Sequence, residues 1–197
     1  ECELIGPDVF YAHGIHFNDE ELKILAQAGS SVAHCPSSNM RLGSGICRVP
    51  EMLALGINVG IAVDGSASND SSDMLGEVRN ALLLQRVLNG AAALTTRQVF
   101  KMATENGAKM LNFGKVGKLE EGWAADMAIF DVQRLPYAGA LSDPVAALIF
   151  CGDDHNTDYT IVNGQVVVDK GQLIGIEEEE LFEKANGVSQ KMLAKAE

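Results

Sequence analysis

The sequence predicts an α/β protein in which a parallel sheet precedes a smaller antiparallel part. In the first 114 residues, three short and almost continuously apolar segments alternate with helical segments, as expected for a parallel sheet covered by helices on both faces. Glycines, a turn and alternating apolar residues follow, which is typical of antiparallel strands. We therefore predict three regions, at residues 1–114, 115–175 and 176–197.

The first predicted strand lies in residues 8–17, where an apolar run ends at His13. A helix follows between Asn18, which is a favourable N-cap residue, and Gly29, which is typical of a C-cap. Acidic residues in its first turn and leucines at helical spacing support this helix. The chain is thus predicted to begin with a strand and the helix that leads to the next one.

Two further strands are predicted, and each ends in a polar residue. The segment 30–36 ends at His34, and the segment 58–65 ends at Asp64. A helix at residues 49–56, with proline near its start and glycine at its end, connects them. Because the chemistry of parallel α/β folds lies at the carboxyl ends of the strands, the polar residues that end all three strands predict an active site.

The remaining elements are three helices and a hairpin. Residues 73–88 and 95–111 have apolar residues at helical spacing, and each is predicted to form an amphipathic helix. An Asn-Gly pair between two apolar runs predicts a β-hairpin in residues 159–175. Residues 177–197 are predicted to form one terminal amphipathic helix.

Composition excludes several classes of function. The net charge of −12 argues against binding to the phosphate backbone of a nucleic acid, which needs clustered lysine and arginine. No apolar run approaches the ~20 residues that span a bilayer, so we expect no membrane segment. The four cysteines are widely spaced and form no C-x-x-C pair, which favours reduced thiols in the cytoplasm. The N-terminus has no features of a signal peptide and no initiator methionine, so we expect a processed chain or a piece of a larger one.

Several motifs together resemble the amidohydrolase superfamily. They are "AHGIHF", "AHCPSSNMRLGSGI", "VDGSASND" and "GKLEEGWAADMAIFD", which occur in this order along the chain. The branch they resemble is that of the deaminases and chlorohydrolases. The segments "SNMRLGSGI", "DGSASNDSSDMLGEVRNALLLQR" and "DYTIVNGQVVV" are most similar to the group of 8-oxoguanine deaminases and hydroxydechloroatrazine hydrolases.

The resemblance implies a (β/α)8 barrel with a small β-sandwich, of which this chain holds only part. A complete barrel takes ~250 residues, and only three barrel strands are predicted here. They would be about strands six to eight, followed by part of the β-sandwich and a C-terminal helix. The H-x-H motif of the first strand and the histidine and glutamate of the fifth are absent. The resemblance therefore implies that the N-terminal part of the same enzyme completes the site, and we expect a homo-oligomer.

Two residues are the predicted catalytic pair. The resemblance implies that Asp64 binds the metal and takes the proton of the metal-bound water, and that His13 bonds the attacking water or the substrate. The alternatives are structural: an Asp-Gly pair is a common turn, and a single histidine at a strand end is more often a core residue. Polar residues at neighbouring strand ends favour the catalytic interpretation.

Two other histidines are candidates for substrate binding. His34 ends the second strand and could contact the substrate, but it could equally be a buried histidine whose ring N–H bonds a backbone carbonyl. His16 lies at the start of the loop after the first strand. Ser38 and Asn39 are expected to bond the backbone of their own loop, and Glu77 is expected to form a surface ion pair.

We predict a metal-dependent hydrolytic deaminase of a purine-like heterocycle of the 8-oxoguanine or guanine type, with this chain supplying part of the site. The resemblance implies a divalent metal, Zn²⁺ with Fe²⁺ as the alternative. One alternative function is hydrolysis of a chloro- or amino-s-triazine by the same residues. Another is a non-catalytic fragment or subunit that needs a second chain, since one carboxylate and one or two histidines cannot hold a catalytic zinc alone. We expect the isolated chain to be inactive.

Overall fold

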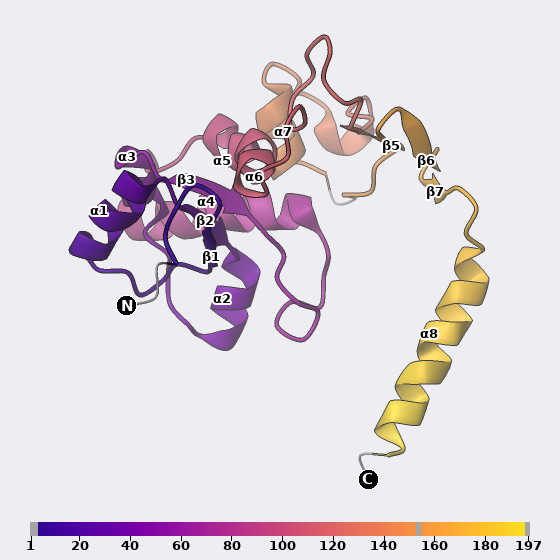
Figure 1. Cartoon of the computed structure of the whole chain (residues 1–197). Helices are drawn as coiled ribbons and strands as arrows, with labels where there is room; N and C mark the ends of the chain where they lie inside the picture. The colour runs from indigo at the N-terminus through magenta and orange to yellow at the C-terminus, as the bar shows by residue number, and fades with distance from the viewer. Residues whose placement is uncertain (1–3, 153–154, 196–197) are drawn as a thin grey trace. The chain divides into compact units, whose positions relative to one another are not determined.

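The computed structural model describes residues 4–152 and 155–195, which divide into two units (Figure 1). The first unit comprises residues up to 123 and the segment 132–155, and the second comprises residues 124–131 and 156–197. The chain enters the second unit after residue 123, returns to the first after a single strand, and enters the second again at residue 156.

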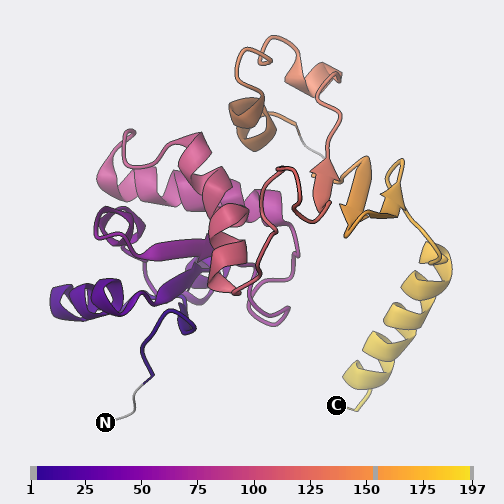
Figure 2. The same cartoon turned by 45° about the horizontal axis from the view of Figure 1, so that its top comes forward.

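The first unit is built on a parallel sheet of three strands, as the sequence predicts (Figure 2). The strands are β1 (Phe10–Ala12), β2 (Ser31–His34) and β3 (Asn58–Ile61), and they lie in the order β1-β2-β3. Ala12 pairs with Ala33, and His34 pairs with Ile61, so all three strands end at the same edge of the sheet.

Helix α1 (Asp19–Ala28) has the predicted ends. The side chain of Asn18 accepts hydrogen bonds from the backbone of Glu20 and Glu21, and the Glu21 carboxylate accepts from the Asn18 backbone, which completes a capping box. Gly29 ends the helix in the left-handed conformation, with φ of 74°. The helices α3 (Val49–Ala54) and α4 (Met74–Asn89) are also found where they are predicted.

Two α-helices of the first unit were not predicted, α2 (Pro36–Leu42) and α7 (Pro144–Phe150). Each begins with proline in the first turn, where the missing N–H would have no intrahelical partner in any case. Both have seven residues, which is too short for a clear helical period.

The predicted helix at 95–111 is two helices, α5 (Thr96–Ala103) and α6 (Glu105–Met110). The chain turns at Thr104, and this turn brings α6 against β3. The side chain of Asn106 donates to the carbonyl of Val59, and the side chain of Asn58 donates to the carbonyl of Asn106. The break at Thr104 thus places α6 where side chains satisfy the carbonyls of Val59 in β3 and of Asn106 in α6.

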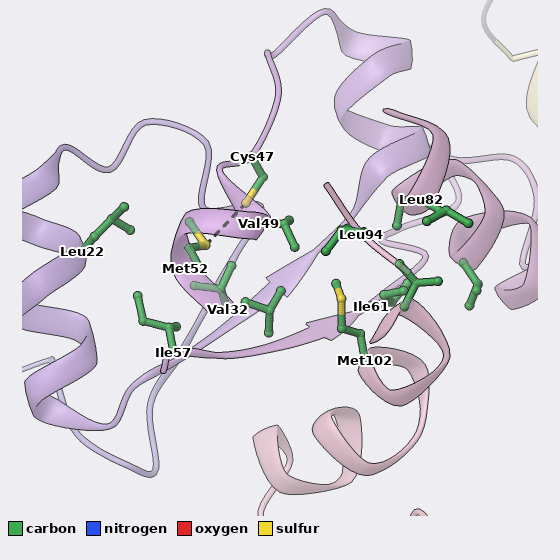
Figure 3. Packing of buried hydrophobic residues seen from close by; sticks show 14 of the residues in the cluster. Leu22, Val32, Cys47, Val49, Met52, Ile57, Ile61, Leu82, Leu94 and Met102 are labelled. Carbon is green, nitrogen blue, oxygen red and sulfur yellow. Dashed lines mark hydrogen bonds between the residues drawn. The ribbon is translucent and has the colours of Figure 1, made fainter. Parts of the chain in front are cut away.

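The core of the first unit lies between the sheet and its helices (Figure 3). Val32 and Val59 of the strands are fully buried, and Met52 and Met102 reach them from α3 and α5. The described cysteines are free thiols, and burial raises the pKa of Cys47 to about 12. The three strands thus extend from a buried apolar core to the edge where His13 and Asp64 lie.

The second unit contains an antiparallel sheet in the order β4-β5-β6-β7, as the alternating pattern predicts. Its strands are β4 (Met127–Ile129), β5 (Tyr159–Val162), β6 (Gln165–Asp169) and β7 (Gln172–Leu173). The predicted Asn-Gly turn joins β5 to β6, and both of its residues have positive φ. Helix α8 (Glu178–Leu193) forms as predicted, but none of its residues is buried. Within the described ranges, no helix is both long and apolar enough to cross a bilayer.

Candidate active site

Two of the predicted residues meet at the carboxyl edge of the parallel sheet. His13 follows β1 directly, and Asp64 lies three residues beyond β3. The Nε2 atom of His13 is 3.9 Å from Oδ2 of Asp64, and both side chains are partly exposed. The ends of β1 and β3, which lie on either side of β2, thus bring an imidazole and a carboxylate together at the carboxyl edge of the sheet.

The backbone of both residues is in the left-handed region, with φ of 66° in each case. This conformation is uncommon outside glycine and costs on the order of 1–3 kcal/mol where the surroundings enforce it. At His13 the enforcement is visible, since its backbone N–H donates to the carbonyl of Ala33 at 2.8 Å and Gly14 continues the turn at φ of 62°. The strained turns aim both side chains into one space.

Two hydroxyl groups hold the carboxylate of Asp64. Ser38 and Ser68 each donate a hydrogen bond of 2.6 Å to its Oδ2 atom. These bonds, that of Ser38 first, stabilise the charged form and lower the pKa of Asp64 to about 2. Asp64 is therefore ionised throughout the physiological pH range.

The imidazole of His13 has a partner on its other side. Its Nδ1 atom lies 2.8 Å from Oδ1 of Asn39. Ser38 and Asn39 are consecutive and buried, so one turn of α2 holds both Asp64 and His13. The expectation that these two side chains bond their own loop was wrong, because the segment is a helix and turns them toward the neighbouring strand ends.

The expected surface ion pair of Glu77 was also wrong. Its side chain is 2% exposed, and its carboxylate accepts hydrogen bonds from the backbone N–H of Ser37 and from the side chain of Asn69. Asn69 also donates to the carbonyl of Val63, immediately before Asp64. Glu77 therefore ties α4 to the start of α2 and to the loop that carries Asp64.

His34 lies beneath the site rather than in it. It is fully buried, and neither ring nitrogen has a hydrogen-bond partner among the described residues. Burial, followed by the nearby His13, lowers the pKa of His34 to about 4, so the ring is neutral at physiological pH. The alternative for His34 was a core histidine whose ring N–H bonds a backbone carbonyl, and that bond is not observed. Because the ring is fully buried, its position gives no support to a direct substrate contact.

A cavity of about 590 Å³ opens at this edge of the sheet. It falls in the size range of small-molecule sites. His16 contributes to its wall, as do the aromatic pair Tyr11 and Phe17, whose rings meet edge to face at 5.4 Å. The complete lining is Tyr11, Ala12, His13, Gly14, Ile15, His16, Phe17, Glu21, Leu42, Ser44 and Asp64.

The donors at the site match part of a zinc ligand set. An ionised carboxylate and an imidazole nitrogen are both zinc ligands, and catalytic zinc takes three protein ligands. In the described part of the chain, no three histidine, cysteine, aspartate or glutamate residues lie close enough to hold a metal together. The carboxylate of Asp64, with the imidazole of His13 beside it, therefore fits one position of a zinc ligand set.

A histidine beside an ionised carboxylate at the carboxyl edge of a parallel sheet is the arrangement expected of an enzyme site in an α/β fold. The sequence model described as "Amidohydrolase family" matches residues 2–167, and the chain belongs to this family.

The curated relatives fall in the branch that the motifs indicate. The chain is 41% identical over 190 residues to the 8-oxoguanine deaminase of Pseudomonas aeruginosa, covering 96% of this chain and 42% of that protein. It is 39% identical over 185 residues to the 5-methylthioadenosine/S-adenosylhomocysteine deaminase of Pyrococcus furiosus, covering 93% and 44%. The chain thus spans less than half the length of these relatives.

Solved structures show the same branch. Atrazine chlorohydrolase from Arthrobacter aurescens, complexed with zinc, is 33% identical with a TM-score of 0.88, over 92% of this chain and 41% of that one. An adenosine deaminase from Xanthomonas campestris with bound zinc is 30% identical with a TM-score of 0.92, over 97% and 44%. The resemblance to deaminases and chlorohydrolases of the amidohydrolase superfamily is confirmed.

Proposed function

We propose that the protein is a metal-dependent aminohydrolase that removes the amino group of a purine-like heterocycle of the 8-oxoguanine or guanine type. The observation that carries this proposal is the 3.9 Å approach of His13 to Asp64 at the mouth of an apolar cavity. The 41% identity to an 8-oxoguanine deaminase supports the choice of substrate.

Asp64 is the metal ligand that this chain supplies, and the zinc in two related structures favours Zn²⁺ over Fe²⁺. A divalent cation at such a site lowers the pKa of a bound water toward ~7 and so supplies a nucleophile at neutral pH. The remaining ligands and the group that protonates the ring are proposed to come from residues outside this chain.

The residues of this chain position a water and accept its proton. The ionised carboxylate of Asp64 takes a proton as the water oxygen bonds to the ring carbon that carries the amino group. His13 orients the water or the polarised atom of the substrate through Nε2. The proton then passes to the amino group, the C–N bond breaks, and ammonia leaves. His16, on the cavity wall, is proposed to contact the substrate.

The rest of the proposal concerns the complete molecule. Since relatives are more than twice as long, we propose that β1 to β3 are about strands six to eight of a (β/α)8 barrel. The free buried thiols of Cys35 and Cys47 are compatible with a reducing cytoplasm, and the assembly is proposed to be a homo-oligomer.

A second candidate function is hydrolysis of an s-triazine. The similarity to a zinc-bound atrazine chlorohydrolase favours it, and the same water and the same residues would displace chloride or an amine. In both reactions the same residues would direct water at an electron-poor ring carbon. The residues of this chain therefore do not distinguish the deaminase from the triazine hydrolase.

A product assay separates the two functions. The full-length protein loaded with Zn²⁺ is incubated with 8-oxoguanine, guanine, S-adenosylhomocysteine and a chloro-s-triazine, and ammonia and chloride are measured. The proposal expects ammonia from an oxopurine with the highest kcat/KM of the set. Chloride release with a higher kcat/KM would favour the triazine hydrolase, and no turnover of any aminated heterocycle would contradict the deaminase.

A further inference from the structure

We propose that Asn39 is a positioning residue that keeps His13 in one tautomer, with the proton on Nδ1 and the lone pair of Nε2 turned toward Asp64. This inference rests on the proposed function only for its kinetic consequence. The tautomer itself is a property of the fold and can be measured without a substrate.

The contact between the two side chains carries the inference. Oδ1 of Asn39 lies 2.8 Å from Nδ1 of His13, and Asn39 is 1% exposed, so this side of the ring faces a buried partner. A carbonyl oxygen only accepts hydrogen bonds, so Nδ1 must donate. A neutral imidazole has one N–H, and its Nε2 atom then carries a lone pair.

This tautomer leaves two acceptors facing one another. Nε2 of His13 is 3.9 Å from the Asp64 Oδ2 atom, which Ser38 and Ser68 already hold as an acceptor. Two acceptors repel unless a donor or a cation lies between them. The arrangement therefore suits a water or a cation at the mouth of the cavity. The other tautomer would place an Nε2–H toward the carboxylate and favour closure of the gap by a direct bond.

Asn39 is held firmly enough to impose this choice. It lies in α2, whose start is fixed by Pro36 and by the bond from Ser37 to the buried Glu77. Its own Nδ2 atom is buried without a partner among the described residues, an arrangement that costs about 1–3 kcal/mol. A polar group left unsatisfied next to a strained histidine is typical of a site shaped for function rather than for stability.

The reverse orientation of the amide makes the opposite prediction. Nδ2 would then donate to Nδ1, and His13 would carry its proton on Nε2. Nitrogen-15 NMR of the histidine-labelled full-length protein distinguishes the two tautomers in the wild type, with the His13 signal assigned by its loss in His13→Gln. We expect Nδ1 protonated and Nε2 unprotonated. Protonation at Nε2 would overturn the proposal.

Two substitutions extend the test. Asn39→Leu removes the acceptor at similar volume, and we expect a mixture of tautomers with kcat lowered ~10–100-fold and KM little changed. Asn39→Asp keeps an accepting oxygen at the same position, so we expect Nδ1 of His13 to stay protonated and kcat to be higher than in Asn39→Leu. The matched control is Asn89→Leu, which removes an exposed amide that bonds Gln85 on α4. We expect this control to change neither the tautomer of His13 nor kcat.

The outcomes separate this inference from the proposed function. An unchanged tautomer and unchanged kcat in Asn39→Leu would contradict the positioning role, and so would loss of the Nδ1 proton of His13 in Asn39→Asp. If Asn39→Leu does not fold, the wild-type spectrum and Asn39→Asp still decide the question. Absence of turnover in the wild type would contradict the proposed function, while the tautomer measurement would stand.

Discussion

The hydroxyl of Ser38 donates a hydrogen bond of 2.6 Å to the carboxylate of Asp64, and the next residue, Asn39, contacts the imidazole of His13. A single turn of α2, which follows β2, therefore holds groups from the ends of both neighbouring strands.

Loss of the carboxylate is predicted to remove activity without unfolding the protein. Asp64→Asn keeps the shape of the side chain but cannot accept the proton, and we expect kcat/KM to fall ~10²–10⁴-fold. Steady-state ammonia release by the full-length protein measures this. Asp70→Asn is the matched control, since Asp70 is exposed in the same loop, pairs with Arg41 and is expected to retain activity. Equal activity of the two variants would contradict the role of Asp64.

Removal of one hydroxyl beside Asp64 is predicted to weaken zinc binding. Ser38→Ala leaves the carboxylate with fewer partners to orient it, and we expect a ~10–100-fold loss of zinc affinity or activity. Competition with a chelator measures the affinity. Ser37→Ala is the control, because the Ser37 hydroxyl accepts a hydrogen bond from the side chain of Asn80, whereas that of Ser38 donates to Asp64. Unchanged zinc affinity and unchanged activity in Ser38→Ala would show that the bond does not orient the ligand.

The buried His34 is predicted to make stability depend on pH. Its folded pKa of about 4 lies below the unfolded value of 6.5, so the unfolded chain binds more protons between these limits. The free energy of unfolding should fall as the pH drops from 6.5 to 4, by about 3 kcal/mol from this residue.

Urea denaturation across this range tests the prediction. His34→Leu removes the titrating ring, and its free energy of unfolding should fall less with pH than that of the wild type. Parallel pH dependences in the two proteins would mean that His34 is not buried as a neutral ring.

The buried carboxylate of Glu77 is predicted to stabilise the site from behind. Glu77→Leu leaves the Ser37 N–H and the Asn69 amide without their acceptor, at about 1–3 kcal/mol for each donor. Thermal unfolding should show the loss, and Glu77→Gln, which keeps one acceptor, should lose less. Glu105→Gln, at an exposed ion pair with Lys101, should lose under about 1 kcal/mol. A loss in Glu77→Leu no larger than in this control would contradict the proposed support.

Strong local signals made much of the fold predictable. The capping pair of Asn18 and Gly29 marks both ends of α1, and the apolar runs that end at His13 and Asp64 mark β1 and the end of the β3 segment. Parallel strands end at one edge, so the meeting of these two residues followed from the order of elements.

The supporting contacts were not predictable in the same way. Helix α2 is too short for a helical period, and its Ser38 and Asn39 resemble ordinary loop residues until the helix turns them toward the strand ends. Glu77 is an acidic residue in the first turn of α4, a common position for a solvated carboxylate, and nothing local shows that it accepts from the backbone N–H of Ser37. Such contacts depend on tertiary packing between segments about 25 to 40 residues apart.

The central claim is that the site of His13 and Asp64 adds water to the ring carbon that carries the amino group. Reaction of the zinc-loaded full-length protein with 8-oxoguanine in H₂¹⁸O tests it most directly, with ammonia and the mass of the purine product measured together. The account predicts one ¹⁸O atom in the product for each ammonia released, and neither in Asp64→Asn. Ammonia without incorporated ¹⁸O, or no ammonia from any aminated heterocycle, would contradict it.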